Sequence, residues 1–382
     1  MFTFEVDAQA VFAERARQFT AWGIPAATVA EARHGIDEMW GTRARAWVPV
    51  WARAARAAER EGRWLRAAQL WGAARFPALA EPARQEAYEH QRRCYARAAF
   101  GLPVRFERRT VGVPVGGRTV EFPVHLLARR YPRRPGVLVM SGGVDTWKTE
   151  IHRMAVATAL ATGLLVVVVD MPGTGESPVP LAPDGDRVLG GLVELLREQR
   201  PGEPVGYFGL SFGGHWAVKL ALRGVVDAAV DLGGPTGAAG RQTDVLALPY
   251  GMAGIIGNAL RLTALPDAAT ATDLFGGFSL RRQGLLDTPG GSPLLAINGA
   301  DDQYIPLGDT TGLAPRPGTT VWIVRGATHC AAERVRPVLA GSWGWLLRRF
   351  GAPAAVERIL GLPSRRHVLP QHRGTAPGLS WQ

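Results

Sequence analysis

The stretch Gly209-Leu210-Ser211-Phe212-Gly213 places a serine between two glycines, where an apolar run meets a segment of helical pattern. Serine bonds readily to nearby backbone groups, so it is a poor residue for the middle of a strand or a helix. In the pattern G-x-S-x-G, a sharp strand-to-helix turn holds the serine in a strained conformation with its hydroxyl exposed. We therefore expect Ser211 to be the nucleophile of a hydrolase.

A nucleophilic serine needs a general base, and the base needs a carboxylate to orient it. The histidines that follow Ser211 are His215, His329, His367 and His372. His215 stands one helical turn beyond the serine, so we expect it to line the pocket or to pack, and the last two fall in an expected tail. His329 directly follows the apolar run TVWIVRG, at the carboxyl end of an expected strand where such sites form. We predict that His329 is the base.

The acid should lie between the serine and the histidine in the chain. Two adjacent aspartates, Asp301 and Asp302, follow the apolar run PLLAING. Their spacing from Gly299 and Pro306 favours Asp302, as does the need for a buried acid beside the base. We predict that Asp302 orients the base and that Asp301 is a turn residue.

The tetrahedral intermediate of such a reaction needs hydrogen-bond donors that are already in place. One donor should be the backbone N–H of Phe212, the residue after the nucleophile. The other should come from the loop SGGVD that follows the apolar run GVLVM, where glycines let the backbone come close to the substrate. Gly143 and Val144 are both candidates for this second donor.

The elements around these residues predict an α/β fold. From residue 104, eight strand-like runs alternate with helical stretches, and the middle runs are continuously apolar, as in parallel strands buried on both faces. The first two runs are separated by a Gly-Gly pair and should form a hairpin. We predict an α/β-hydrolase fold: a mostly parallel eight-stranded sheet with helices on both faces, preceded by an all-helical N-terminal cap domain.

We expect a helical cap over residues 1–103, a catalytic domain over 104–352 and a tail over 353–382. The connection over about 235–292 is unusually long and contains two helical stretches, and such insertions are often functional. From about Leu362 the tail is rich in Pro, Arg, His and Gly without a period, so we expect its end to be flexible. Six aromatic residues of the cap are candidates for a pocket wall, although each is more commonly plain core: Trp40, Trp47, Trp51, Trp64, Trp71 and Phe76.

Composition excludes several classes of protein. Hydrophobic residues make up 47% and charged residues 20%, which is ordinary for a soluble globular protein. No apolar run reaches the roughly 18 residues of a membrane span, and the N-terminal stretch is unlike a signal peptide. Cys94 and Cys330 are far apart and form neither a disulfide framework nor a metal pattern. We expect a cytoplasmic protein with no membrane partner, no metal and no cofactor.

The formal net charge of +11 raises the question of nucleic-acid binding. Apart from Lys148 and Lys219 the basic residues are arginines, which is typical of a GC-rich genome. They are scattered, and no stretch interleaves them with aromatic residues as in single-strand binders. We expect a small-molecule substrate and no nucleic-acid partner. A homodimer is a further expectation, because two-fold dimers are the commonest assemblies.

Five motifs together resemble one known family: MSGGVDTWKTE, VVVVDMPGTGESP, GLSFGG, INGADDQYIP and GATHCAAE, in order over about residues 60–350. It is the α/β-hydrolase family of 2,6-dihydroxypseudooxynicotine hydrolase, the fungal heptaketide-shortening pigment hydrolases and the FrsA-like esterases. The resemblance implies a helical cap over the carboxyl ends of the strands. It also implies hydrolysis through Ser211, Asp302 and His329 without a metal or organic cofactor.

The most specific part of the resemblance is the loop GG-D-x-x-K-x-E, which Asp145, Lys148 and Glu150 match and in which Trp147 is a bulky residue. We interpret the charges as structural, with a Lys–Glu pair and an aspartate turn that hold the loop. The alternative is a direct chemical role or a role in substrate binding. We favour the structural interpretation, since charged groups near a site often support the residues that touch the substrate instead of touching it themselves. His152 is interpreted as a residue on the solvent side.

Members of the family cleave either a C–C bond next to a carbonyl, as in β-diketones and polyketide chains, or a carboxylic ester. We therefore expect a serine hydrolase of a carbonyl compound that works through an acyl-enzyme. One alternative is an acyl-transferring or cyclising enzyme, in which an internal nucleophile intercepts the acyl-enzyme. Another is a hydrolase-fold protein that binds a ligand without turnover, which the complete Ser–Asp–His set disfavours.

Overall fold

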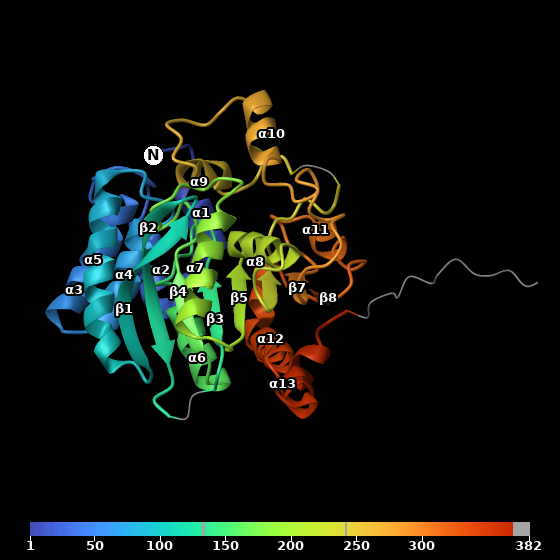
Figure 1. Ribbon diagram of the computed structural model, residues 1–382. Helices are drawn as coiled ribbons and strands as arrows, with labels where there is room; N and C mark the ends of the chain where they lie inside the picture. Colours follow the sequence, from blue (N-terminus) through green and yellow to red (C-terminus); the bar gives the residue numbers. More distant parts are fainter. Residues whose placement is uncertain (132–133, 241–242, 370–382) are drawn as a thin grey trace, which may run out of the picture.

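The computed structural model describes residues 1–131, 134–240 and 243–369. One twisted sheet forms the centre of the molecule, with a helical region packed beside its β1–β2 end (Figure 1). The strands are β1 (Arg105–Val115), β2 (Arg118–Ala128), β3 (Val137–Ser141), β4 (Leu165–Val169), β5 (Val205–Leu210), β6 (Ala228–Leu232), β7 (Leu294–Gly299) and β8 (Thr319–Val324).

The sheet has the order β1-β2-β4-β3-β5-β6-β7-β8. The first two strands form an antiparallel hairpin, β2 pairs antiparallel with β4, and the remaining pairs are parallel. Every residue of β3, β4, β6 and β7 is buried, as the continuous apolar runs predict. The predicted α/β-hydrolase fold with a mostly parallel eight-stranded sheet is confirmed.

Helices cover both faces of this sheet. Because side chains alternate along a strand, Val137 and Val139 of β3 enter one core with α7 (Asp186–Gln199) and α8 (Phe212–Leu222). Leu138 and Met140 enter a second core with α6 (His152–Thr162) and α12 (Val335–Arg349). The helices of the catalytic domain and the C-terminal region are α6 (His152–Thr162), α7 (Asp186–Gln199), α8 (Phe212–Leu222), α9 (Met252–Ala259), α10 (Ala268–Gly276), α11 (Leu307–Thr311), α12 (Val335–Arg349) and α13 (Ala354–Arg365), with a 3₁₀ turn η2 (His329–Arg334).

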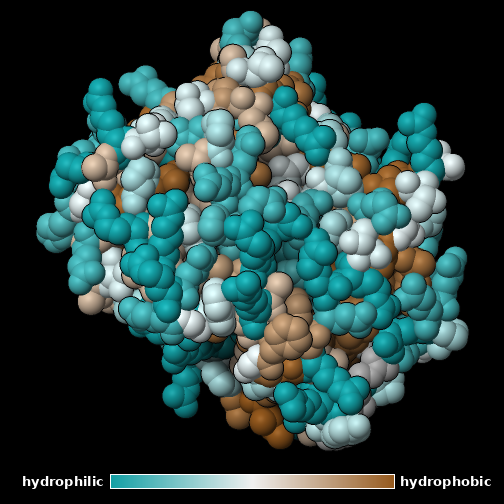
Figure 2. Space-filling view, turned by 90° about the vertical axis from the view of Figure 1, so that its left-hand side faces the viewer, coloured by the Kyte–Doolittle hydropathy of each residue, from teal (hydrophilic) through white to brown (hydrophobic). Residues whose placement is uncertain are grey.

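The N-terminal region is helical, as predicted, and has a core of its own. Its elements are α1 (Ala8–Trp22), α2 (Ala26–Gly35), α3 (Trp47–Arg60), α4 (Trp64–Arg75), α5 (Pro82–Ala98) and the 3₁₀ turn η1 (Ala99–Gly101). Phe12, Phe19, Trp47, Trp51 and Phe76 stack and tilt against one another in its interior. The face of the molecule that this region turns to solvent is mostly hydrophilic (Figure 2).

The long connection between β6 and β7 contains α9 and α10, which lie beyond one end of the sheet (Figure 1). The first predicted helical stretch, residues 251–265, forms α9 only up to Ala259, and Arg261 beyond it has a positive φ of 60°. The second forms only α10, because Leu280 to Leu285 are held by turns. Within the described ranges, no helix is long and apolar enough to cross a membrane.

The tail differs from its expected character up to residue 369. Helix α13 reaches Arg365, beyond the expected start of the flexible end at Leu362, although Pro363 lies inside it. Its Ser364 packs closely on α12, where a Cβ added to Gly341 would lie 2.5 Å from Ser364 Oγ. Val368 then pairs with Val324 at the edge of the sheet. Residues 370–382, the rest of the predicted tail, lie outside the described residues.

Candidate active site

Ser211 stands at the turn between β5 and α8 in a conformation that few side chains adopt. Its backbone angles are φ 55° and ψ −127°, outside the regions that suit an L-residue. A Cβ on Gly209 or Gly213 would collide with backbone of the turn or of the neighbouring loop. The motif's glycines are therefore required for the turn, and the strain holds the Ser211 hydroxyl at the mouth of a cavity.

The structure brings Ser211, His329 and Asp302 together. Ser211 Oγ lies 2.9 Å from His329 Nε2, and His329 Nδ1 lies 2.8 Å from Asp302 Oδ2. The Asp302 carboxylate also accepts hydrogen bonds from the Asn298 amide at 2.6 Å and from the backbone N–H of Tyr304 at 2.7 Å. These bonds hold the carboxylate in one orientation. The adjacent Asp301 is exposed.

The electrostatics of the pair suit a base held by an acid. Burial opposes the charged form of Asp302, but the hydrogen bond and charge of His329 outweigh it and lower the pKa of Asp302. Burial also opposes the imidazolium of His329. The hydrogen bond to Asp302 and the negative charge of its carboxylate favour the imidazolium, and the pKa of His329 is raised. A positive charge that forms on His329 is therefore stabilised.

Both candidate sources of the oxyanion donors lie beside Ser211. Phe212 begins α8, so its backbone N–H has no partner within the helix. A Cβ added to Gly143 would lie 2.8 Å from Ser211 Cβ and 3.5 Å from the Phe212 nitrogen, so the loop backbone passes directly over the serine. Val144, the other candidate, is buried and lines the cavity.

The charges of the GG-D-x-x-K-x-E loop are buried, but they are not paired as we expected. Lys148 pairs with Asp170 and, at 2.8 Å, with Glu176, whereas Glu150 pairs at 2.9 Å with Arg75 of the N-terminal region. The predicted Lys148–Glu150 pair is wrong because residues two apart in a helical turn do not face each other. Both pairs tie the loop to other elements.

The remaining side chains of this loop also point away from the cavity. Asp145 pairs with Arg15 at 3.2 Å. The Trp147 indole donates to the Val144 carbonyl at 3.0 Å, and the Arg75 guanidinium lies 3.6 Å from its ring centre. Of the loop's residues, Val144 is the one that meets the cavity in the described structure.

Two further histidines are buried structural residues. His215 Nδ1 lies 2.9 Å from the Pro235 carbonyl, and burial lowers the pKa of His215 to about 4. It packs against Phe212 and does not reach the cavity. His152 is buried as well, which corrects its interpretation as a solvent-side residue. The Tyr95 ring of the N-terminal region covers it.

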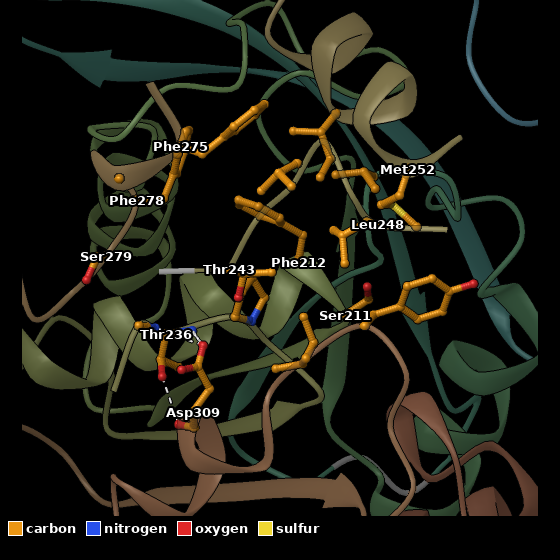
Figure 3. A pocket seen from close by; sticks show the side chains of 18 of the residues that line it. Ser211, Phe212, Thr236, Thr243, Leu248, Met252, Phe275, Phe278, Ser279 and Asp309 are labelled. Carbon is orange, nitrogen blue, oxygen red and sulfur yellow. Dashed lines mark hydrogen bonds between the residues drawn. The ribbon is translucent and has the colours of Figure 1, made fainter. Parts of the chain in front are cut away.

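The cavity beside Ser211 has a volume of about 410 Å³ and a largely apolar wall. Figure 3 shows Leu248 and Met252 on the same side as Ser211, with Phe275 and Phe278 opposite. Most of its wall comes from the connection between β6 and β7, together with the loops after β3, β5, β7 and β8: Val144, Ser211, Phe212, Pro235, Thr236, Gly237, Gly240, Thr243, Val245, Leu248, Met252, Ile256, Phe275, Gly276, Phe278, Ser279, Arg281, Arg282, Tyr304, Ile305, Asp309 and His329.

The six aromatic candidates of the cap do not belong to this wall, as far as the chain is described. Trp47, Trp51 and Phe76 are almost completely buried in the core of the N-terminal region. These side chains form the core of the N-terminal region because they face one another across its helices, so they do not point toward the cavity. The insertion, the other expected source of the wall, supplies most of it.

Two carboxylates near the site carry no sequence signal that we used. Asp309 of α11 accepts hydrogen bonds from the backbone N–H groups of Thr236, Gly237 and Ala239, so it fixes the loop where the insertion begins (Figure 3). Asp231, at the end of β6, is fully buried, and burial raises its pKa to about 8. An aspartate inside an apolar strand, as in AAVDL, is the signal that marks it.

Metal ligation has no support in the described ranges, which contain no cluster of three or more His, Cys, Asp or Glu side chains able to hold an ion.

Comparisons with known proteins find relatives among esterases and α/β hydrolases. The family model "Esterase FrsA-like" matches residues 27–315. Esterase FrsA of Serratia proteamaculans is 29% identical over 258 residues, which cover 61% of this chain and 57% of that protein. The α/β hydrolase ucsC of an Acremonium species is 28% identical over 193 residues, which cover 44% of this chain and 38% of that protein. The chain thus spans little more than half, or less, of these relatives' length.

Two solved structures share the fold along most of their length. AbyA5 superposes with a TM-score of 0.73 at 21% identity, covering 93% of this chain and 99% of that one. 2,6-Dihydroxy-pseudo-oxynicotine hydrolase gives 0.69 at 21% identity, covering 87% and 95%. The family match, over most of the catalytic domain and the helical region before it, identifies the chain as a member of the FrsA-like esterase family with an α/β-hydrolase fold.

Proposed function

We propose that this enzyme is a serine hydrolase that cleaves a small, largely apolar carbonyl compound through an acyl-enzyme, with Ser211, His329 and Asp302 as its catalytic triad. The observation that carries the proposal is the hydrogen-bonded series from Asp302 through His329 to Ser211, which opens onto an apolar cavity. That order of acid, base and nucleophile is what acyl transfer requires.

In the proposed reaction, His329 Nε2 accepts the proton of Ser211 as Oγ attacks the substrate carbonyl. Asp302 holds the Nδ1–H side of the ring and stabilises the imidazolium that forms. The negative oxygen of the tetrahedral intermediate lies within reach of the N–H of Phe212 and of the loop at Gly143–Val144. When the intermediate collapses, His329 returns the proton to the leaving group, and water then hydrolyses the acyl-enzyme by the same steps.

The same residues serve two leaving groups. An ester releases an alcohol, whereas a β-diketone releases a carbanion or enol that the second carbonyl stabilises, and His329 protonates either one. The cavity supports an apolar acyl portion, since its wall is largely apolar and nine of its 22 lining residues are valine, leucine, isoleucine, methionine or phenylalanine. We therefore place both carboxylic esters and β-diketones within the substrate class.

The test compares the wild type with Ser211→Ala on p-nitrophenyl esters of increasing acyl length and on alkyl β-diketones, in water enriched in ¹⁸O. We expect the wild type to release a carboxylic acid that carries one ¹⁸O from water and Ser211→Ala to lose that activity. Ser342→Ala, in α12 and outside the cavity, is the matched control and should retain it. Release of a cyclic product without ¹⁸O would assign acyl transfer to an internal nucleophile instead, and a folded wild type without turnover would contradict the proposal.

A further inference from the structure

We propose that helix α1 of the N-terminal region is a positioning element of the active site, with Arg15 as its principal residue. The inference rests on the proposed function, because it concerns the loops that carry the proposed oxyanion donors and triad. Four side chains of α1 reach the loops after β3, β7 and β8, although they stand more than a hundred residues before them in the chain.

Arg15 is 8% exposed and lies between two of these loops. Its guanidinium stands 3.2 Å from the Asp145 carboxylate, next to Val144 in the loop over Ser211. It also lies 5.3 Å from the ring centre of Tyr304, whose ring in turn meets the His329 ring edge-on at 5.2 Å. One side chain of the cap thus contacts both the oxyanion loop and the residue that packs against the base.

The neighbouring residues of α1 repeat these contacts. Glu14 accepts hydrogen bonds from the Tyr304 hydroxyl at 2.9 Å and from the Gln303 amide at 2.6 Å, and both donors directly follow Asp302. Gln18 donates to Thr146 Oγ1 at 2.6 Å, in the oxyanion loop. Each of the two loops is therefore contacted by two side chains of the same helix.

The histidine loop is reached through a weaker contact. Arg17 pairs with Glu333 at 3.1 Å, and Glu333 accepts hydrogen bonds from the backbone N–H and the hydroxyl of Thr328, the residue before His329. The Arg17 side chain is 85% exposed, so solvent screens this pair. It should contribute little compared with the buried Arg15–Asp145 pair.

Helix α1 is itself held firmly, which a positioning element needs. Its other face places Phe12 and Phe19 in the aromatic core of the N-terminal region. None of its described residues belongs to the cavity wall. The contacts should therefore affect the reaction rate rather than substrate binding.

The experiment measures kcat and KM of the full-length chain on a p-nitrophenyl ester for the wild type, Arg15→Met, Arg15→Lys and Gln18→Ala. For Arg15→Met we expect kcat to fall about 10²-fold, because displacing a catalytic group by about 1 Å has an effect of that size. KM should stay within about threefold of the wild type. The lysine variant should recover part of this loss, because the pair with Asp145 needs a single contact and not a fork. Gln18→Ala removes the hydrogen bond to Thr146 and the one that the Gln18 side-chain oxygen accepts from Arg15 at 3.1 Å, but it leaves the Arg15 charge in place. It should lower kcat several-fold and keeps the test available if Arg15→Met does not fold.

Arg45→Met is the matched control, since Arg45 pairs with Asp37 on the surface of the same region, away from the active-site loops. It should leave kcat unchanged, and thermal unfolding of each variant should show that the assay temperature lies below its transition. Wild-type kcat in folded Arg15→Met and Gln18→Ala would overturn this inference alone. Absence of Ser211-dependent turnover in the wild type would overturn the proposed function and the inference with it.

Discussion

Two regions pack around the active site: the N-terminal helices and the insertion between β6 and β7. We call them the two covers, and they do different things. The N-terminal helices contribute charged and polar side chains that contact the loops around Ser211, while aromatic residues such as Phe12, Phe19 and Trp47 form a separate core. The insertion between β6 and β7 contributes apolar side chains to the cavity itself, from Val245 through Phe278. One cover therefore holds the site in shape, and the other faces the substrate.

The comparison teaches that a cap need not line a pocket to matter for catalysis. The buried pairs Arg15–Asp145 and Arg75–Glu150 join the N-terminal region to the oxyanion loop. Breaking a buried pair from one side leaves an uncompensated charge, so these contacts are expensive to disturb. Among the described residues, the insertion forms no such ion pair with the catalytic loops. Its start is held by Asp309 of α11, which accepts hydrogen bonds from backbone N–H groups of the insertion.

The largest expected loss of kcat comes from a residue of the catalytic triad, outside both covers. The losses expected from the covers can be compared with it. Asp302→Asn should lower kcat on the order of 10⁴-fold, because the amide favours the wrong tautomer of His329. Asp301→Asn, at the exposed neighbouring position, is the control and should keep wild-type kcat. Steady-state assays measure kcat for both variants. A loss of kcat in Asp301→Asn and not in Asp302→Asn would show that Asp301 is the acid.

The next effect separates the insertion from the N-terminal region. Leu248→Trp adds bulk to the cavity wall beside Ser211, so kcat/KM for long acyl esters should fall about 10²-fold while an acetyl ester is hardly affected. Leu265→Trp, in the same insertion but outside the wall, should change neither. A uniform loss across all chain lengths in Leu248→Trp would show that this residue supports catalysis and not selection.

A third prediction concerns the place where the two covers meet. Phe4 packs its ring on Gly254 of α9 and against Trp40, whose indole donates to the Phe4 carbonyl at 2.6 Å. Phe4→Ala should lower the free energy of unfolding by about 3 kcal/mol. Phe100→Ala, at a 91% exposed position, should change it by less than about 0.5 kcal/mol. Urea unfolding measures both, and equal stabilities would mean that the covers are not joined there.

A fourth, pH-dependent effect lies in the central sheet, beneath the N-terminal region and the insertion. Asp231 keeps its proton in the folded chain up to a pKa of about 8, whereas an unfolded aspartate loses it near pH 4. Between these values the folded state binds more protons, so Asp231 makes the wild type less stable as pH rises, by at most about 1.4 kcal/mol per pH unit. Asp231→Asn should lack this slope. Urea unfolding from pH 5 to 8 measures the free energy of unfolding of both proteins. The same dependence on pH in the wild type and in Asp231→Asn would contradict this prediction.

The sequence predicted the parts of the site that depend on short-range geometry. Ser211, Asp302 and His329 each follow an apolar strand, and because parallel strands end at the same edge, their spacing along the chain was enough to bring them together. The same reasoning predicted the sheet and the insertion. It required no knowledge of which distant segments touch.

The contacts of α1 could not be predicted in this way. Glu14 and Arg15 lie in an ordinary amphipathic segment, and nothing local indicates that their partners are Tyr304 and Asp145. The same holds for His152, which is buried only because Tyr95 of another region covers it. Helix α13 was not predicted. Only its last residues fall in the stretch without a period that begins at about Leu362, and its packing on α12 is a contact that no local pattern indicates.

The central claim, an activated Ser211 in an accessible cavity, is tested most directly by intact-protein mass after exposure to an alkyl phosphonate that reacts with active-site serines. The account predicts a single adduct on the wild type, none on Ser211→Ala, and slower labelling of Asp302→Asn, whose base is misoriented. A folded wild type that acquires no adduct, or a Ser211→Ala variant that acquires the same adduct, would contradict it.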